Sequence, residues 1–130
     1  MRTNLNRMVG AATALYSLAI MVKPMWLAKP CRLTMGPDGS VPADTRLLIK
    51  AIGARDTAIG LAMLTAGSTQ SRREATACRI AADAADAAVF GALLDDRRAR
   101  VKVAAFALAW SGLSAFTLCG PGHRGSAVKK

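Results

Sequence analysis

The chain has 130 residues, 52% of them hydrophobic, and carries a formal net charge of +10. This length allows one domain, and a mean hydropathy of +0.27 combined with so many basic residues is typical of a small integral membrane protein with basic loops. Nucleic-acid binding, the other common reason for a pI near 10.6, is disfavoured because the basic residues form short clusters between apolar runs and have no aromatic residues among them.

The first predicted helix covers about residues 5–28, of which 8–22 are uncharged. A basic start followed by an apolar stretch also fits a signal peptide, but Lys23 and Trp26 stand where a small-residue cleavage site would be needed. We therefore expect a retained helix with Trp26 at the membrane interface. Its uncharged part rises about 22 Å, less than a hydrocarbon core of about 30 Å, and Arg7 and Lys23 can extend to the headgroups.

The second predicted helix covers about residues 43–67 and follows a turn-rich loop at 36–42. Charged residues occupy its first half, and its uncharged part begins only at Thr57. Gly53 and Gly60, together with alanines at intervals of four, give it a small-residue face that allows another helix to approach closely in a membrane. We expect the third helix, which is also rich in alanine, to pack there.

The third predicted helix covers about residues 71–95 and carries charged residues in its middle. Arg79, Asp83 and Asp86 stand at i, i+4 and i+7, so a helix places all three on one stripe. Taken alone, this stripe is also typical of the wet face of a soluble helix. Whether this stripe faces water or the inside of a bundle therefore depends on the other helices.

The fourth predicted helix covers about residues 98–119 and is followed by a Gly-Pro stop signal. Its part from 103 to 119 is uncharged and apolar on all sides, without the polar face that a surface helix of a small soluble bundle needs. This helix argues against the alternative of a soluble helical bundle in which the charges of the other helices are solvated.

These elements predict an all-α fold, a four-helix transmembrane bundle over residues 1–119 with a polar basic tail at 120–130. The first and fourth helices pass as membrane spans by themselves. The second and third pass only if their charged faces point into the bundle, because charged groups in lipid are costly. We expect a multi-pass protein of the cell membrane. Its orientation stays open, since the two sides carry nearly equal numbers of basic residues.

The sequence GARDTAIGLAML at residues 53–64, followed by the arginine-led third helix, resembles a family of small bacterial four-helix integral membrane proteins of unassigned function. A more distant resemblance is to DoxX-type membrane proteins. The resemblance covers about residues 45–118, and its most specific part is the Gly-x-Arg-Asp core at Gly53, Arg55 and Asp56. It implies a four-helix membrane fold, but it implies no mechanism.

The candidate catalytic residues are the charged groups expected inside the bundle, namely Asp83, Asp86, Asp56, Arg79 and Arg55. Two arginines and three aspartates can pair with one another and leave one carboxylate over. Burial favours the protonated form of such a carboxylate, which suits a general acid. Asp83 and Asp86 are the expected pair, with one held ionised by Arg79 and the other donating or relaying a proton. In the alternative, Arg79–Asp83 and Arg55–Asp56 with Asp86 form a structural network that fixes the helix register.

Trp110 and Tyr16 are predicted to line a substrate pocket beside these charges, although mid-helix aromatic residues also serve as plain packing. No cofactor and no metal ion is expected, because the sequence has no nucleotide or phosphate-binding motif. Its potential soft ligands also lack metal-site spacing; these are Cys31, Cys78, Cys119 and the tail residue His123.

Three classes of function stay open at the level of sequence. The first is a cofactor-independent enzyme that uses intramembrane Asp/Arg acid–base chemistry on a lipophilic small molecule, for isomerisation, cyclisation or epoxide opening. The second is an accessory or assembly subunit whose charge pairs serve helix recognition. The third is a small proton-coupled carrier, with a homodimer as its expected form. The expected partners are membrane lipid and a lipophilic small-molecule substrate, and nucleic acid is not expected.

Overall fold

Five helices, and no strand, make up the part of the chain that the computed structural model describes, residues 1–120. The all-α prediction is therefore confirmed for this part. The predicted basic tail, with His123, lies outside the described residues except for Gly120. The helices are α1 (Thr3–Val22), α2 (Met25–Ala28), α3 (Ala43–Thr65), α4 (Thr69–Leu93) and α5 (Arg97–Leu118).

The four long helices agree with the predicted ones to within a few residues, except that the first predicted helix was too long. It breaks after Val22, and the separate turn α2 follows. The reason is Pro24, whose ring lacks an N–H and pushes the preceding residue out of the helical region. Lys23 accordingly has φ −124° and ψ 79°.

Side-chain caps set the starts of α4 and α5. Ser68 Oγ accepts a hydrogen bond from the Ser71 N–H at 3.0 Å, and Asp96 Oδ1 accepts one from the Ala99 N–H at 2.7 Å. Each cap satisfies an N–H that has no partner within its helix. The bond from Ala99, together with the nearby charge of Arg32, lowers the pKa of Asp96 below its usual value.

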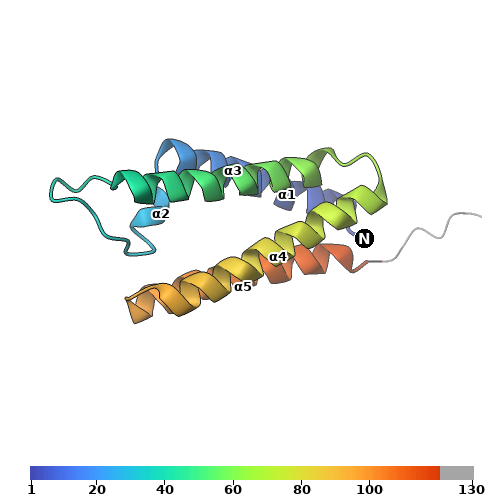
Figure 1. The fold of residues 1–130 in the computed structure, drawn as a ribbon. Helices are drawn as coiled ribbons and strands as arrows, with labels where there is room; N and C mark the ends of the chain where they lie inside the picture. Colours follow the sequence, from blue (N-terminus) through green and yellow to red (C-terminus); the bar gives the residue numbers. More distant parts are fainter. Residues whose placement is uncertain (121–130) are drawn as a thin grey trace, which may run out of the picture.

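The helices are arranged as two antiparallel pairs, α1 with α3 and α4 with α5 (Figure 1). The pairs approach each other at the end that holds the N-terminus and the turn between α3 and α4. They diverge toward the opposite end, where α2 and the following loop lie (Figure 1). Contacts between α1 and α5 are few, so the bundle is closed mainly on the α3–α4 side.

Buried hydrogen bonds tie the narrow end together. Asn6 Nδ2 of α1 donates to Thr76 Oγ1 of α4 at 2.8 Å and to Thr117 Oγ1 of α5 at 2.7 Å. The Arg2 N–H donates to the Thr117 carbonyl at 2.8 Å. One amide group thus uses both of its N–H donors to join α1 to the other helix pair.

Glycines bring α1 and α3 into backbone contact. A Cβ placed on Gly60 would lie 2.6 Å from the Gly10 carbonyl oxygen and 2.8 Å from the Ala14 nitrogen. A Cβ on Gly53 would lie 2.9 Å from the Ser17 carbonyl oxygen. The small-residue face of α3 therefore packs on α1, and the expectation that it would pack on the next helix in the chain was wrong.

Two of the helices in the described region, α1 and α5, are long and apolar enough to cross a membrane. Helices α3 and α4 do not meet the same test, in agreement with the charges noted in their sequences. Large apolar side chains also lie exposed on the outside of all four long helices, among them Leu15, Leu47, Val89 and Leu108.

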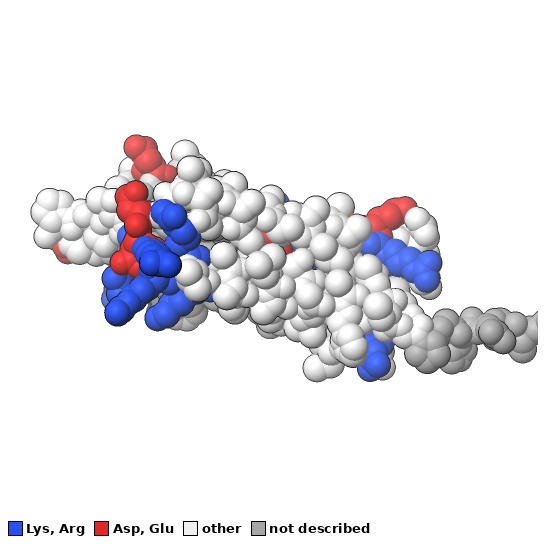
Figure 2. Space-filling model, turned by 90° about the horizontal axis from the view of Figure 1, so that it is seen from below, with Lys and Arg blue, Asp and Glu red and all other residues white. Residues whose placement is uncertain are grey.

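Charged side chains gather at the two ends of the elongated molecule on the face drawn in Figure 2, and a nearly uncharged band separates them. One end is formed by segments 23–46 and 94–102, and the other by the N-terminus and the turn at 66–68. On this face, charged and uncharged surface are therefore segregated along the long axis of the molecule.

The close contact of α1 with α3 predicts that Gly60→Ala lowers the free energy of unfolding by about 1–3 kcal/mol, because the added methyl group meets backbone atoms that cannot move aside. The measurement is unfolding by SDS in mixed micelles, followed by circular dichroism. Gly112→Ala is the matched control, since a Cβ on Gly112 in α5 meets nothing within 4 Å. We expect it to be neutral or stabilising by up to about 1 kcal/mol. Equal effects of the two substitutions would contradict the close contact.

Candidate functional site

The charged residues singled out in the sequence meet in one cluster near the middle of the helices. Arg55 and Asp56 come from α3, and Arg79, Asp83 and Asp86 come from α4. We call these five residues the Asp/Arg cluster. It forms the contact between the two helix pairs at mid-length.

Arg55 links α3 to α4 through a two-pronged contact with Asp86. Its Nη1 and Nη2 atoms donate to Asp86 Oδ1 at 3.1 Å and to Asp86 Oδ2 at 2.6 Å. Its Nε atom donates to Asp56 Oδ1 at 2.9 Å. The planar guanidinium thus holds two carboxylates at once, a geometry that lysine does not offer.

Arg79 is the more deeply buried of the two arginines. Its Nε atom donates to Asp83 Oδ2 at 2.9 Å, and its Nη2 atom donates to Asp83 Oδ1. Its Nη1 atom lies 3.1 Å from Asp56 Oδ2 as an ion pair, but this N–H group has no aligned hydrogen-bond acceptor. Asp56 therefore bridges the two arginines.

All three carboxylates of the Asp/Arg cluster have a guanidinium partner. The pairings Arg79–Asp83 and Arg55–Asp56–Asp86 are those of the predicted network, and the predicted leftover carboxylate without a partner is not found. Asp83 is 2% exposed, Arg79 5% and Asp56 8%. With all groups ionised, three carboxylates and two guanidinium groups leave a formal charge of −1 in this buried position.

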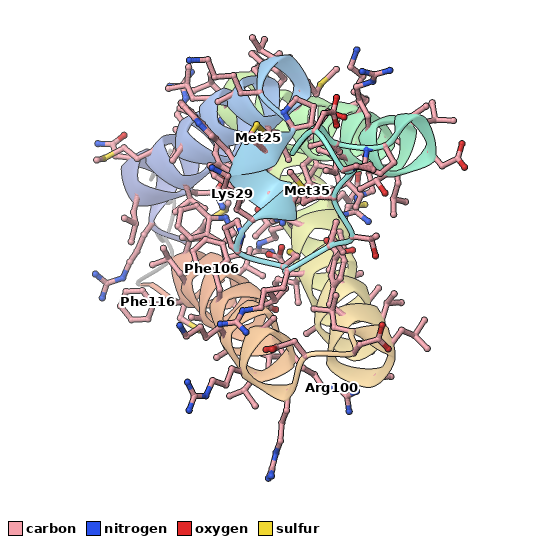
Figure 3. All side chains as sticks on the ribbon, turned by 90° about the vertical axis from the view of Figure 1, so that its left-hand side faces the viewer. Met25, Lys29, Met35, Arg100, Phe106 and Phe116 are labelled. Atoms are coloured by element: carbon pink, nitrogen blue, oxygen red, sulfur yellow. The ribbon has the colours of Figure 1, made fainter. Side chains whose placement is uncertain are left out.

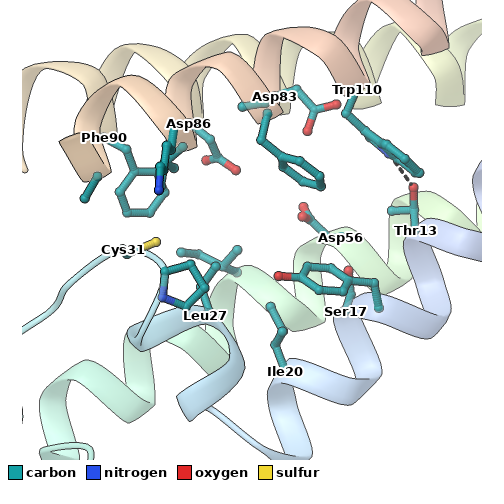
Figure 4. A pocket seen from close by; sticks show the side chains of 18 of the residues that line it. Thr13, Ser17, Ile20, Leu27, Cys31, Asp56, Asp83, Asp86, Phe90 and Trp110 are labelled. Carbon is teal, nitrogen blue, oxygen red and sulfur yellow. Dashed lines mark hydrogen bonds between the residues drawn. The ribbon is translucent and has the colours of Figure 1, made fainter.

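A cavity of about 870 Å³ lies beside the Asp/Arg cluster, between the two helix pairs. Asp56, Asp83 and Asp86 contribute to its wall, and Figure 4 shows these carboxylates and Trp110 directed into the same space. Tyr16, the other residue predicted to line a pocket, lines it as well. The sequence prediction thus placed both aromatic residues next to the charges.

Apolar and aromatic side chains form most of the remaining wall. The rings of Phe106 and Trp110 stack with centroids 6.1 Å apart and an interplanar angle of 16°. Trp110 Nε1 donates to Thr13 Oγ1 at 3.0 Å, so α5 is connected to α1 across the cavity (Figure 4). The bond satisfies the only polar group of the indole and fixes the ring on the wall.

Residues at the wide end of the cavity were missed in the sequence. Lys29 and Arg32 follow α2, and Arg98 and Lys102 belong to the first turns of α5. Cys31 also lines the cavity, and burial raises the pKa of its thiol. In the sequence these residues lie in two distant segments, one after the first helix and one at the start of the last helix, and only the fold brings the two segments together.

No protein-family profile, curated protein or solved structure matches the chain. The resemblance to small four-helix membrane proteins therefore stays a prediction based on the motif at 53–64. Arguments about function rest on the geometry of the cluster and of the cavity.

The burial of the Asp/Arg cluster predicts that Arg79→Gln lowers the free energy of unfolding by about 3–5 kcal/mol, because two buried carboxylates lose their compensating charge. Arg32→Gln breaks the exposed pair with Asp96, whose atoms lie 2.7 Å apart, and should cost less than about 1 kcal/mol. SDS unfolding in mixed micelles measures both. Similar losses in the two variants would show that the cluster is solvated.

Proposed function

We propose that the chain is a multi-pass protein of the cell membrane in which α1, α3, α4 and α5 all cross the bilayer. Their 20, 23, 25 and 22 residues correspond to helices about 30–37 Å long, enough for a hydrocarbon core of about 30 Å. The charges at mid-length of α3 and α4, those of the Asp/Arg cluster, pair with one another, and large apolar side chains lie on the outside. Pairing inside the bundle is the usual way in which charged groups are tolerated at membrane depth.

We further propose that the cavity binds a lipophilic small molecule, on which the Asp/Arg cluster performs acid–base chemistry without a cofactor. The observation that carries this proposal is the position of three carboxylates in the wall of one apolar cavity. The cavity volume of about 870 Å³ lies within the range of about 300–1,000 Å³ typical of small-molecule sites.

The roles of the residues follow from their contacts. A carboxylate held by arginine can accept a proton from a bound molecule or from water, and Asp56 or Asp86 is placed for this step at the cavity wall. The guanidinium of Arg79 belongs to the cavity wall and is a hydrogen-bond donor suited to an oxygen on which negative charge develops. A base beside such a donor suits isomerisation or cyclisation next to a carbonyl group, or epoxide opening by water.

The accessory or assembly subunit is the second candidate, and complete pairing of the carboxylates favours it. In that case the Asp/Arg cluster serves only to hold α3 against α4. The proton-coupled carrier has less support, because α1 contains no acidic residue and the described carboxylates at mid-depth are all engaged by arginine.

The enzyme proposal predicts that Asp86→Asn lowers turnover by at least about a hundredfold, the usual contribution of a general acid–base group. Asp86 suits this test because its partner Arg55 has a side chain 38% exposed, so the variant leaves a guanidinium that water can reach. Glu74→Gln is the matched control, since Glu74 lies exposed on the first turns of α4, accepts a hydrogen bond from Gln70 and is not part of the cavity wall.

The measurement uses protein reconstituted in vesicles and supplied with lipophilic cell extract in deuterated water. Mass spectrometry then detects products that have gained solvent deuterium or one molecule of water. Wild type and Glu74→Gln should form the same product, and Asp86→Asn should not. Identical extracts from all three proteins, with SDS unfolding showing that each is folded, would contradict catalysis and favour the structural network.

A further inference from the structure

The wide end of the cavity is ringed by four basic side chains, those of Lys29, Arg32, Arg98 and Lys102. Arg32 is paired with Asp96, but no carboxylate of the described residues lies within 4.0 Å of the other three. This end of the cavity therefore carries excess positive charge, and the Asp/Arg cluster deeper in carries a formal −1.

The segment that carries Lys29 and Arg32 is held in place by packing. Ala28 and Cys31 are buried, and Cys31 packs with Leu94 and Ala99 at the start of α5. Arg32 has φ +50°, a conformation that non-glycine residues adopt rarely and only where the surroundings impose it. The basic groups of this segment thus belong to a fixed part of the fold.

We place the opening of the cavity between α1 and α5, the helices with few mutual contacts. Tyr16 of α1 and Phe106 of α5 line it and are 45% and 61% exposed. Figure 3 looks onto the wide end and shows Lys29 beside α2, with α5 and Phe106 below it in this view. In a bilayer this opening would face lipid, with the basic ring at headgroup level and the aromatic wall at the level of the chains.

We propose that the cavity binds a single-chain anionic amphiphile that enters from the membrane between α1 and α5. Its carboxylate or phosphate head contacts Lys29, Arg98 and Lys102, and its chain extends along Phe106 and Trp110 toward the Asp/Arg cluster. The opposite charges of the two ends of the cavity set this direction, because the cluster repels an anionic head. The inference rests on the proposed function in placing the reacting part of this molecule at the cluster.

The fluorescence of Trp110 reports directly on the alkyl chain of the bound amphiphile. It lies eight residues beyond Lys102 on α5, about 12 Å along the helix. The sequence has two tryptophans and one tyrosine, so Trp26→Phe leaves Trp110 as the single tryptophan, which excitation at the red edge of the indole absorption band selects over Tyr16. In vesicles of zwitterionic phosphatidylcholine, stearic acid brominated at mid-chain should quench Trp110. The methyl ester of the same acid should need about a tenfold higher concentration to give equal quenching, since its uncharged head makes no charge-assisted contacts with the basic ring.

Neighbouring arginines supply the matched variants. Arg98 lines the cavity and Arg97 does not, although both are exposed and begin α5. We expect Arg98→Gln and Lys102→Gln each to reduce the preference for the acid over the ester severalfold, and Arg97→Gln to leave it unchanged. Equal quenching by acid and ester, or equal effects of Arg97→Gln and Arg98→Gln, would overturn the headgroup site. Relief of quenching by inorganic phosphate as effective as by unbrominated stearate would overturn the choice of an amphiphile as occupant.

One variant separates this proposal from the proposed function. Asp86→Asn should keep the preference for the brominated acid, because Asp86 does not contact the basic ring, while losing turnover. Preference without turnover in the wild type would support the headgroup site and contradict the enzyme proposal. Turnover in the wild type without a preference for the acid over the ester would support the enzyme proposal and contradict the headgroup site.

Discussion

The contact between the arginines and aspartates of α3 and α4 is the constraint on which the bundle depends. Two small apolar clusters lie at the wide end: one joins Ile20 and Ile49 of the first helix pair, the other joins Cys31 and Leu94 at the turn between α4 and α5, and Leu27 and Leu33 pack against both. At mid-length the two pairs meet through the Asp/Arg cluster instead of through a shared apolar core. Each charged group needs its partner there, so the cluster sets the spacing and register of α3 and α4.

The cavity is a consequence of how differently the helices are held together. Gly10 and Gly60 press α1 and α3 into one tight pair, and Asn6 ties the narrow end of the bundle. At the wide end, α2 and its loop stand between the pairs (Figure 1). The cavity then remains between α1 and α5, with the Asp/Arg cluster at its inner wall and the basic ring at its wide end. The proposed chemistry and the proposed amphiphile site use the two ends of this single space.

The sequence predicted the parts of this arrangement that depend on local spacing. Apolar runs predicted the four long helices, and the spacing of Arg79, Asp83 and Asp86 predicted their common stripe. Partner choice was not predictable in the same way, because a small-residue face such as that of Gly60 fits any neighbouring helix. The basic ring at the wide end of the cavity also depends on the segment after α2 meeting the start of α5 in space, and no sequence periodicity indicates such a meeting.

The central claim is that all four long helices cross the membrane, which places the Asp/Arg cluster at mid-depth. Single cysteines at exposed positions test it most directly, in a chain whose three native cysteines are replaced. A membrane-impermeant maleimide is added to sealed vesicles of one orientation carrying Thr34→Cys, Gly67→Cys or Thr3→Cys. The account predicts that position 34 reacts from one side of the membrane and positions 67 and 3 from the other. Labelling of positions 34 and 67 from the same side would contradict it, since α3 would then not span the bilayer.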